Sequence, residues 1–353
     1  MLSNYYYNIL NPIEQNVYTV IYNALISRMP TCTITNNGLA NPGADIRRIW
    51  QSVTLDHPEI IYYPALFFET VPMGTVTKLL FEYTTVDQNV FNKRLNGIIN
   101  EIEKSLPSYA SDYFVCKKIY DAIASFVEYD FEVLKEYKEL DKGNASNDRK
   151  FQFMEERSIV FTPYGIIMNS KGVCEGIAKL FKIVCDKFGI QCACVLAKNK
   201  EGIEHMLNVV EIDGERSYVD VTAGLKSQFK HLDMVLYKYF LMPSCVYNKE
   251  NTVVTEFECS CEENSFFAKN GLWFKSFTSL REYLCAYTFS STNGEIQVFY
   301  DGDMLNDREL EKAFSEILSL HLPENYRIAG ISVDKGFCIG KIDRSINDND
   351  SEE

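Results

Sequence analysis

The stretch KGVCEGIAKLF, residues 171–181, places Cys174 between two glycines at the start of an apolar helical repeat. The apolar positions after it follow a spacing of three and four residues and end at a glycine: Ile177, Leu180, Phe181, Val184 and Phe188, then Gly189. Cys174 is therefore predicted in the first turn of a buried helix, where unpaired N–H groups favour a thiolate and can hold an oxyanion. Gly172 and Gly176 are expected to leave the sulfur open to a substrate backbone. The alternative is a structural cysteine, because free cysteines are often buried and the chain has 11 of them.

A thiolate nucleophile needs an imidazole, and His205 opens a pair of strand-like runs, HMLNVVEIDGERSYVDVT, over residues 205–222. Asp213-Gly214 in the middle of this stretch is a strong signal for a two-residue hairpin turn. That turn sets a register in which Leu207 lies opposite Asp220, so that His205 and Asp220 share one face as diagonal neighbours. A three-residue loop with a bulge would break this pairing.

The other histidines are predicted at surface or capping positions: His57 in the turn LDHPEI, His231 at the helix start FKHLDM, and His321 at a helix end close to Pro323. The candidate catalytic triad is therefore Cys174 as nucleophile, His205 as general acid and base, and Asp220 as the group that orients the imidazole.

Composition limits the partners of the chain. It has 353 residues, 46% of them hydrophobic, and a net charge of -14, which argues against the clustered Lys and Arg that nucleic acid requires. The first residues, MLSNYYYNILNP, lack a basic signal-peptide start, and no later segment reaches the roughly 20 apolar residues of a membrane span. We expect a cytoplasmic protein that binds neither nucleic acid nor a membrane.

The cysteines are odd in number and lack a disulfide framework, so reduced thiols are expected. The C-x-C pairs, Cys192 with Cys194 and Cys259 with Cys261, have neither the C-x-x-C spacing nor a nearby second ligand pair. No metal or other cofactor is therefore predicted.

Three regions and a tail are predicted, with α+β as the overall fold class. Residues 1–105 indicate an α+β extension, in which helices over 11–29 and 87–106 flank strands over 60–71 and 75–85. Residues 106–250 combine helices, one of them beginning at Ser111, with an antiparallel sheet. Residues 262–345 follow the order β, α, β, α, β, β of a separate small α/β sandwich, and residues 346–353 form an acidic disordered tail.

The residues of the candidate triad resemble the transglutaminase-like superfamily, whose members have a G-x-C helix start, a His followed by an Asn on a strand, and an Asp on the next strand. Here Gly172-Val173-Cys174, His205 with Asn208, and Asp220 match that pattern. The resemblance covers about residues 106–225 and implies a transglutaminase-like, papain-like core.

The resemblance extends upstream to features of bacterial members. Tyr129-Asp130 is similar to their Tyr-Asp pair, and Tyr164-Gly165 to an aromatic-Gly step before the cysteine, so Tyr164 is the expected side-chain oxyanion donor. The chain departs from the family at Met206 and Leu207, where an Ala and a Trp are usual, and at Ala223-Gly224, where an aromatic residue is usual. These departures alter the expected pocket around the histidine.

The activity that the resemblance implies is acyl transfer to or from a peptide or protein substrate. Hydrolysis of a peptide or amide bond is the first expectation, because nothing indicates a lysine-binding tunnel or the acidic clusters of a calcium site. A protein-crosslinking transglutaminase is the first alternative. The second is a catalytically inactive interaction protein, with the C-terminal domain binding a protein partner.

Overall fold

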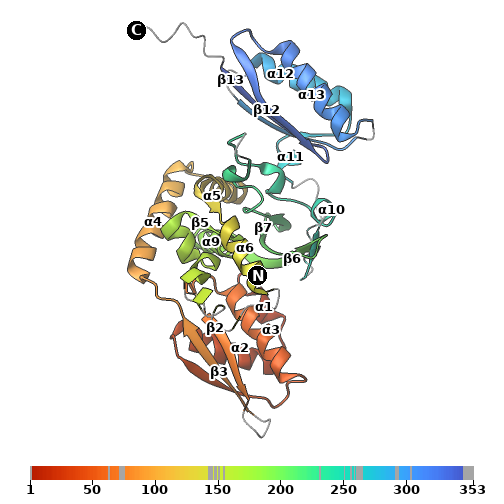
Figure 1. Cartoon of the computed structure of the whole chain (residues 1–353). Helices are drawn as coiled ribbons and strands as arrows, with labels where there is room; N and C mark the ends of the chain where they lie inside the picture. The colour runs from red at the N-terminus through yellow and green to blue at the C-terminus, as the bar shows by residue number, and fades with distance from the viewer. Residues whose placement is uncertain are drawn as a thin grey trace.

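The computed structural model describes residues 2–344 except 63, 71–75, 142–145, 147–148, 150–151, 154–155, 230–231, 250, 255–256, 258, 260–264, 291–293 and 303. The tail predicted at 346–353 and the histidine His231 therefore lie outside the described residues. Helices and strands are mixed along the chain, which confirms the predicted α+β class. Figure 1 shows an N-terminal part with β2 and β3 at one end, a central part around α9, and a C-terminal part with α12 and α13 at the other end.

The N-terminal part contains α1 (Tyr5–Asn8), α2 (Pro12–Ile26), β1 (Thr31–Thr35), α3 (Pro42–Asp56), β2 (Pro64–Thr70), β3 (Val76–Tyr83) and α4 (Gln88–Ser105). Its antiparallel sheet has the order β1-β3-β2. The Asn11 side chain accepts hydrogen bonds from the first turn of α2 while Glu14 reaches back, a capping box that fixes where this helix begins. The predicted α2, β2, β3 and α4 are present, whereas β1 and α3 were not predicted.

The central part carries the helices α5 (Asp112–Phe126), α6 (Phe131–Asp141), α8 (Pro163–Asn169), α9 (Cys174–Lys187) and α10 (Ser244–Tyr247). A short turn of 3-10 helix, η1 (Ser158–Phe161), precedes α8, and η2 (Lys226–Phe229) and η3 (Tyr237–Tyr239) follow the sheet. The strands β6 (Gln191–Asn199), β7 (Glu204–Ile212), β8 (Glu215–Val219) and β9 (Asn251–Val253) form an antiparallel sheet with the order β8-β7-β6-β9. Two residues each of β4 (Glu128–Tyr129) and β5 (Lys171–Gly172) pair in parallel.

The hairpin of β7 and β8 has the predicted register. Ile212 pairs with Glu215, and the ladder continues to Asn208 opposite Val219. The turn residues Asp213 and Gly214 both have positive φ, 55° and 80°, as a two-residue primed turn requires. The strand β8 ends at Val219, so Asp220 is the first residue after it rather than a residue within it.

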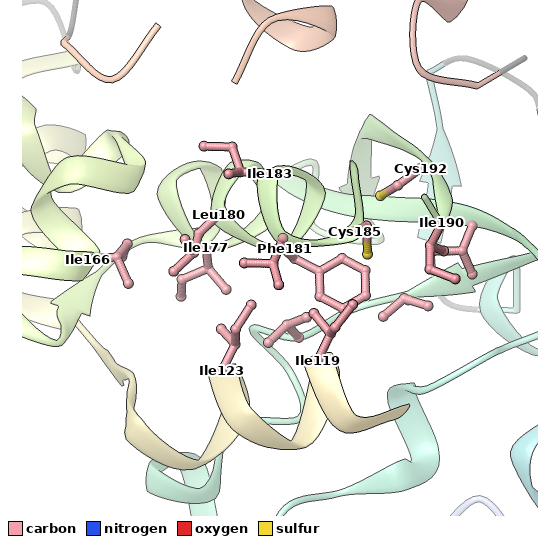
Figure 2. Close-up of a cluster of buried hydrophobic side chains, with 14 of the residues drawn as sticks. Ile119, Ile123, Ile166, Ile177, Leu180, Phe181, Ile183, Cys185, Ile190 and Cys192 are labelled. Carbon is pink, nitrogen blue, oxygen red and sulfur yellow. The ribbon is translucent and has the colours of Figure 1, made fainter. Parts of the chain in front are cut away.

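The helix α9 lies in the middle of the main core, as its apolar spacing predicted. Ile177, Leu180 and Phe181 are all 0% exposed. Figure 2 shows this face of α9 above Ile119 and Ile123 of α5. Replacing a buried Phe of this kind by Ala costs about 3–5 kcal/mol, so the packing fixes the position of the helix that begins with Cys174.

The C-terminal part contains α11 (Phe266–Lys269), β10 (Trp273–Phe274), α12 (Phe277–Ser290), β11 (Gly294–Tyr300), α13 (Asp307–His321), β12 (Tyr326–Asp334) and β13 (Phe337–Arg344). From β10 onward the elements follow the predicted order. The sheet order is β10-β11-β13-β12, with β10 and β11 parallel and α12 as the crossover between them. This sheet and its two long helices enclose a hydrophobic cluster of their own.

One buried amide joins the C-terminal sheet to the central part. The side chain of Gln297 on β11 accepts a hydrogen bond from the Tyr237 N–H at 2.8 Å and donates one to the Val235 carbonyl at 2.7 Å. Phe267, Phe299 and Phe337 also belong to the main core cluster rather than to the cluster under α12 and α13. The C-terminal part is therefore packed against the central part through polar and apolar contacts.

No helix among the described residues is both long and apolar enough to cross a lipid bilayer.

Candidate functional site

Cys174 is the first residue of α9, as its sequence context predicted. The preceding residue, Val173, has extended backbone and no side-chain cap for the helix, so its side chain takes none of the N–H groups of the first turn. Cys174 is partly exposed, whereas Cys185, Cys192 and Cys194 are buried. Its sulfur therefore lies close to solvent and to the N-terminal end of the helix. This position is typical of a nucleophilic cysteine rather than of a cysteine in the core.

The glycines that flank Cys174 serve packing, which corrects their expected role. A Cβ atom on Gly172 would lie 2.9 Å from the Val160 carbonyl oxygen, and one on Gly176 would lie 2.7 Å from the same atom. Real side chains do not approach a backbone oxygen that closely, so both positions need glycine for η1 to lie against the first turn of α9. The glycines set the position of the cysteine, and the space beside them is filled by backbone rather than left open to a substrate.

His205 and Asp220 meet as the hairpin register predicted. Nε2 of His205 lies 2.7 Å from Oδ2 of Asp220. Asp220 is 4% exposed, and its other oxygen accepts a hydrogen bond from the Ala223 N–H at 3.0 Å. The carboxylate is therefore fixed at both oxygens and in turn fixes the imidazole.

Cys174 is the other neighbour that acts on the imidazole. Its side chain lies close enough to the ring of His205 to raise the pKa of that histidine. Since Nε2 is used by Asp220, the nitrogen available for the sulfur is Nδ1. The structure thus brings His205 onto Asp220 and places Cys174 near the same ring.

Electrostatics favour the protonated ring. Burial lowers the pKa of His205, but the charge of Asp220, its hydrogen bond, and the nearby side chain of Cys174 together raise that pKa well above its usual value. A ring that keeps its proton can act as a general acid toward a leaving group.

Tyr129, which precedes Asp130 at the end of β4, is the tyrosine that contacts the nucleophile. The side chain and the backbone N–H of Cys174 both lie close enough to the Tyr129 hydroxyl to shift its pKa. Burial raises the pKa of Tyr129, and the charge of Cys174 raises it further, so the hydroxyl keeps its proton. The pairing of Tyr129 with Gly172, two residues before the cysteine, explains how the ring reaches this place.

Tyr164, the expected oxyanion donor, has its hydroxyl bound to Asp87 in this structure. Its hydroxyl accepts a hydrogen bond from the Asp87 N–H at 3.1 Å, and its ring stacks on Phe91 of α4 with 6.1 Å between centroids. Tyr164 therefore fastens α8 to α4. The sequence gives little indication that Tyr129, rather than Tyr164, lies beside Cys174. The strands that place Tyr129 there, β4 and β5, pair through only two residues each, which is too short for a strand pattern to be recognised.

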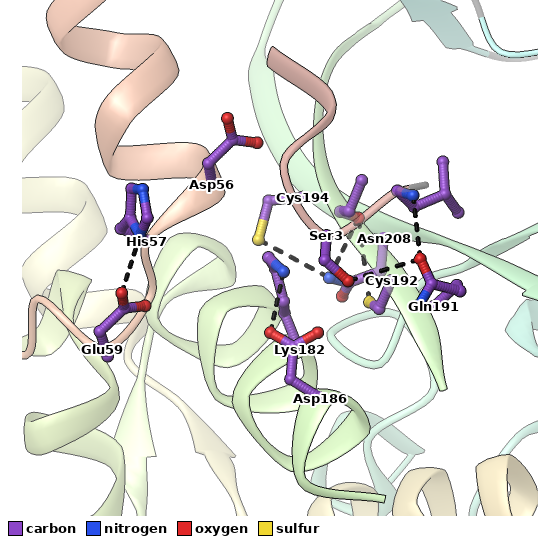
Figure 3. Close-up of polar contacts among 12 residues, drawn as sticks. Ser3, Asp56, His57, Glu59, Lys182, Asp186, Gln191, Cys192, Cys194 and Asn208 are labelled. Atoms are coloured by element: carbon purple, nitrogen blue, oxygen red, sulfur yellow. Dashed lines mark hydrogen bonds and ion pairs between the residues drawn. The ribbon is translucent and has the colours of Figure 1, made fainter. Parts of the chain in front are cut away.

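Asn208 links the two catalytic elements. Its side chain is 0% exposed and donates hydrogen bonds to the Ala178 carbonyl of α9 at 3.0 Å and to the Ala193 carbonyl of β6 at 3.4 Å. Figure 3 shows this amide beside Cys192 and Cys194. Because Asn208 lies on the strand of His205, the contact ties that strand to the helix of Cys174.

The N-terminal residues form an apolar wall beside the sulfur. Tyr5 and Cys174 pack against one cluster, which contains Tyr6 and Met206. The Tyr6 hydroxyl donates a hydrogen bond to the Cys194 carbonyl at 2.8 Å. Asp56 at the end of α3 accepts hydrogen bonds from Tyr6 N–H, Tyr7 N–H and the Tyr18 hydroxyl, and so anchors this segment. The chain before residue 10 is thus part of the surroundings of the nucleophile.

His57 is the residue that ends α3, a capping position as predicted. Its Nδ1 is 2.7 Å from Oε1 of Glu59, and its ring stacks on Tyr22 with 4.0 Å between centroids. In Figure 3 this pair lies to the left of Lys182 and Asp186, two residues of α9. His57 and Glu59 therefore belong to the contact between the N-terminal part and α9.

No family model matches the chain, and no curated protein matches it. Among solved structures, it is similar to a TGase, with a TM-score of 0.31 and 14% identity over 47% of this chain; it spans 46% of that protein's length. It is also similar to a candidate cysteine protease from Cytophaga hutchinsonii, with a TM-score of 0.27 and 12% identity over 57% of this chain and 81% of that one. A candidate protease from Parabacteroides distasonis gives a TM-score of 0.28 and 8% identity over 80% of this chain and 62% of that one. These are weak resemblances at the level of fold.

Proposed function

We propose that this protein is a transglutaminase-like thiol enzyme that hydrolyses a peptide or amide bond through a thioester on Cys174. The observation that supports the proposal most directly is the hydrogen bond between Nε2 of His205 and Asp220, with Cys174 close enough to the same ring to raise the pKa of His205. A nucleophile, a base and a group that orients the base are the parts that covalent acyl transfer requires.

The reaction has two half-steps. In the first, the Cys174 thiolate attacks the substrate carbonyl carbon, and His205 gives its proton to the leaving amine. In the second, His205 takes a proton from water, which attacks the thioester and releases the acid. Asp220 keeps Nδ1 of the ring directed at the sulfur throughout, and the raised pKa of His205 ensures that the ring carries the proton that the leaving amine needs.

The oxyanion of each half-step needs two donors. The backbone N–H of Cys174 is the first, because it lies at the start of α9. The Tyr129 oxygen occupies the place beside this N–H in the resting enzyme. A substrate carbonyl oxygen displaces it, and the Tyr129 hydroxyl then donates to the oxyanion as the second donor.

The substrate segment next to the scissile bond lies along the wall that Tyr5 contributes, together with Leu196 from β6. Both side chains are partly exposed and apolar over most of their surface, so the site favours a peptide with a bulky apolar residue near the scissile bond. Water completes the reaction in this proposal, and an amine acceptor would make the same site a crosslinking one.

Alkylation kinetics test the triad without knowledge of the substrate. We expect iodoacetamide at pH 6 to modify Cys174 at least about tenfold faster than the exposed Cys245, and His205→Ala to abolish the difference, because a thiolate reacts where a thiol does not. His57→Ala is the matched control, since that ring pairs with Glu59 away from the site. Equal rates at Cys174 and Cys245 would identify an inactive scaffold.

Peptide and amide libraries, with products identified by mass spectrometry, then test the reaction. Hydrolysis that disappears in Cys174→Ala supports the proposal. If the enzyme transfers the acyl group to a primary amine in preference to water under the same conditions, the proposed reaction becomes crosslinking instead of hydrolysis. The proposed roles of the triad residues would not change.

A further inference from the structure

A second thiol–imidazole pair lies in the C-terminal part, far along the chain from the triad. Sγ of Cys285 on α12 is 3.2 Å from Nε2 of His321, the last residue of α13. The two helices contact each other and lie together on the same side of the C-terminal sheet in Figure 1. His321 was expected only to occupy a helix end, and Cys285 only to be one of the reduced thiols.

The core beneath the pair holds its geometry. Leu284, next to Cys285, and Leu318, one turn before His321, are both 0% exposed and belong to the same hydrophobic cluster. Cys285 packs against the edge of that cluster and is itself only partly buried. Solvent therefore reaches a sulfur whose distance to an imidazole is set by two packed helices.

His321 lies in the last turn of α13. The carbonyl groups at the end of α13 carry the negative end of the helix dipole, which stabilises a cation in the last turn. An imidazolium at hydrogen-bond distance stabilises a thiolate, and nucleophile and base within about 3.2 Å are the usual signature of an activated thiol. The reactivity inferred for Cys285 therefore depends on His321 as well as on the cysteine itself.

We infer that Cys285 is a second reactive thiol and a modification site for small disulfides of the glutathione disulfide class. The Cys285 thiolate attacks one sulfur of the small disulfide, so that a bond forms between Sγ and that sulfur while the original S–S bond breaks. The departing thiolate takes the proton of the His321 imidazolium. The products are a mixed disulfide on Cys285 and one small thiol, and no further oxidant is needed. Partial burial between α12 and α13 restricts the partner to a small molecule.

The full chain can be tested with glutathione disulfide at pH 7, with the adducts mapped by peptide mass spectrometry over time. Cys245 is the internal control for accessibility, because it is exposed while Cys285 is only partly so. We expect Cys285 to acquire the adduct at least about tenfold faster than Cys245, and Cys285→Ser to remove that adduct alone. A Cys285 rate equal to or below that of Cys245 would overturn the inference without any variant.

The His321→Gln variant tests the role of the imidazole. It should slow the reaction of Cys285 about tenfold or more while leaving the rates of Cys245 and Cys174 unchanged. An unchanged Cys285 rate would show that the imidazole does not activate the thiol. Because Cys174 is mapped separately in the same digest, loss of reactivity at the triad and loss at Cys285 are distinguished in one experiment.

Discussion

The Asn208 side chain donates a hydrogen bond to the Ala178 carbonyl at 3.0 Å, and this contact connects the strand of His205 to the helix of Cys174. Neither residue takes part in the proposed chemistry, yet the sulfur and the imidazole come from elements that are otherwise separate in the chain. A change of a few tenths of an ångström at this contact would move the thiol relative to the ring, and positioning of that accuracy is what catalysis by such a pair requires.

Asn208→Ala should therefore reduce both stability and reactivity. Removing the buried amide leaves the Ala178 carbonyl without this donor, which costs about 1–3 kcal/mol in the free energy of unfolding. We expect the alkylation rate of Cys174 to fall as well, measured beside urea unfolding. Gln297→Ala is the comparison variant, because it removes a buried bridging amide that binds Tyr237 and Val235 rather than α9. If both variants lose stability but keep the Cys174 rate, Asn208 is a structural residue only.

The raised pKa of His205 makes stability depend on pH in a defined direction. The folded chain binds the proton of His205 more tightly than the unfolded chain, whose histidine has a pKa of about 6.5. The stabilising contribution is therefore complete below about pH 6.5 and is lost as the pH rises toward the folded-state pKa. Urea unfolding of the native chain and of His205→Gln at pH 6, 7.5 and 9 measures this. The difference between the two should shrink at high pH, and a constant difference would contradict it.

The close approach at Gly176 predicts intolerance of even a methyl group. A Cβ there meets the Val160 carbonyl oxygen at 2.7 Å, and overpacking against backbone costs about 1–3 kcal/mol. Gly97→Ala in α4 is the matched control, since no atom lies within 4 Å of its Cβ position and alanine favours a helix over glycine by about 0.5–1 kcal/mol. Thermal unfolding should show opposite shifts. A Gly176→Ala chain as stable as the native one would mean that η1 moves freely away from α9.

The sequence allowed the catalytic hairpin to be predicted because a two-residue turn leaves no freedom in register. Asp213-Gly214 sets which residues of β7 and β8 are opposite, and hence that His205 and Asp220 meet. The apolar period of α9 similarly fixed the position of Cys174. These are local signals, in which a turn or a helical face determines its own geometry.

Other features depend on contacts between distant segments. The helix α3 and the strand β1 escaped prediction because α3 contains many polar residues and β1 has only five residues. The contact of Tyr129 with Cys174 depends on the pairing of β4 with β5, and the close approach at Gly176 depends on η1. Sequence spacing carries little information on either, since both are decided by how separate elements pack.

Tyr129 and Tyr164 provide the sharpest test of the oxyanion proposal, because the same substitution is available at both. Tyr129→Phe removes the hydroxyl that lies beside Cys174, and the loss of an oxyanion donor lowers kcat on the order of 100-fold. Tyr164→Phe removes only the acceptor for the Asp87 N–H, so it should cost about 1 kcal/mol of stability and leave kcat unchanged. Steady-state hydrolysis of the best library peptide separates these outcomes. An increase in kcat for Tyr129→Phe would show instead that this hydroxyl blocks the oxyanion position, because its departure would then free the Cys174 N–H for the substrate.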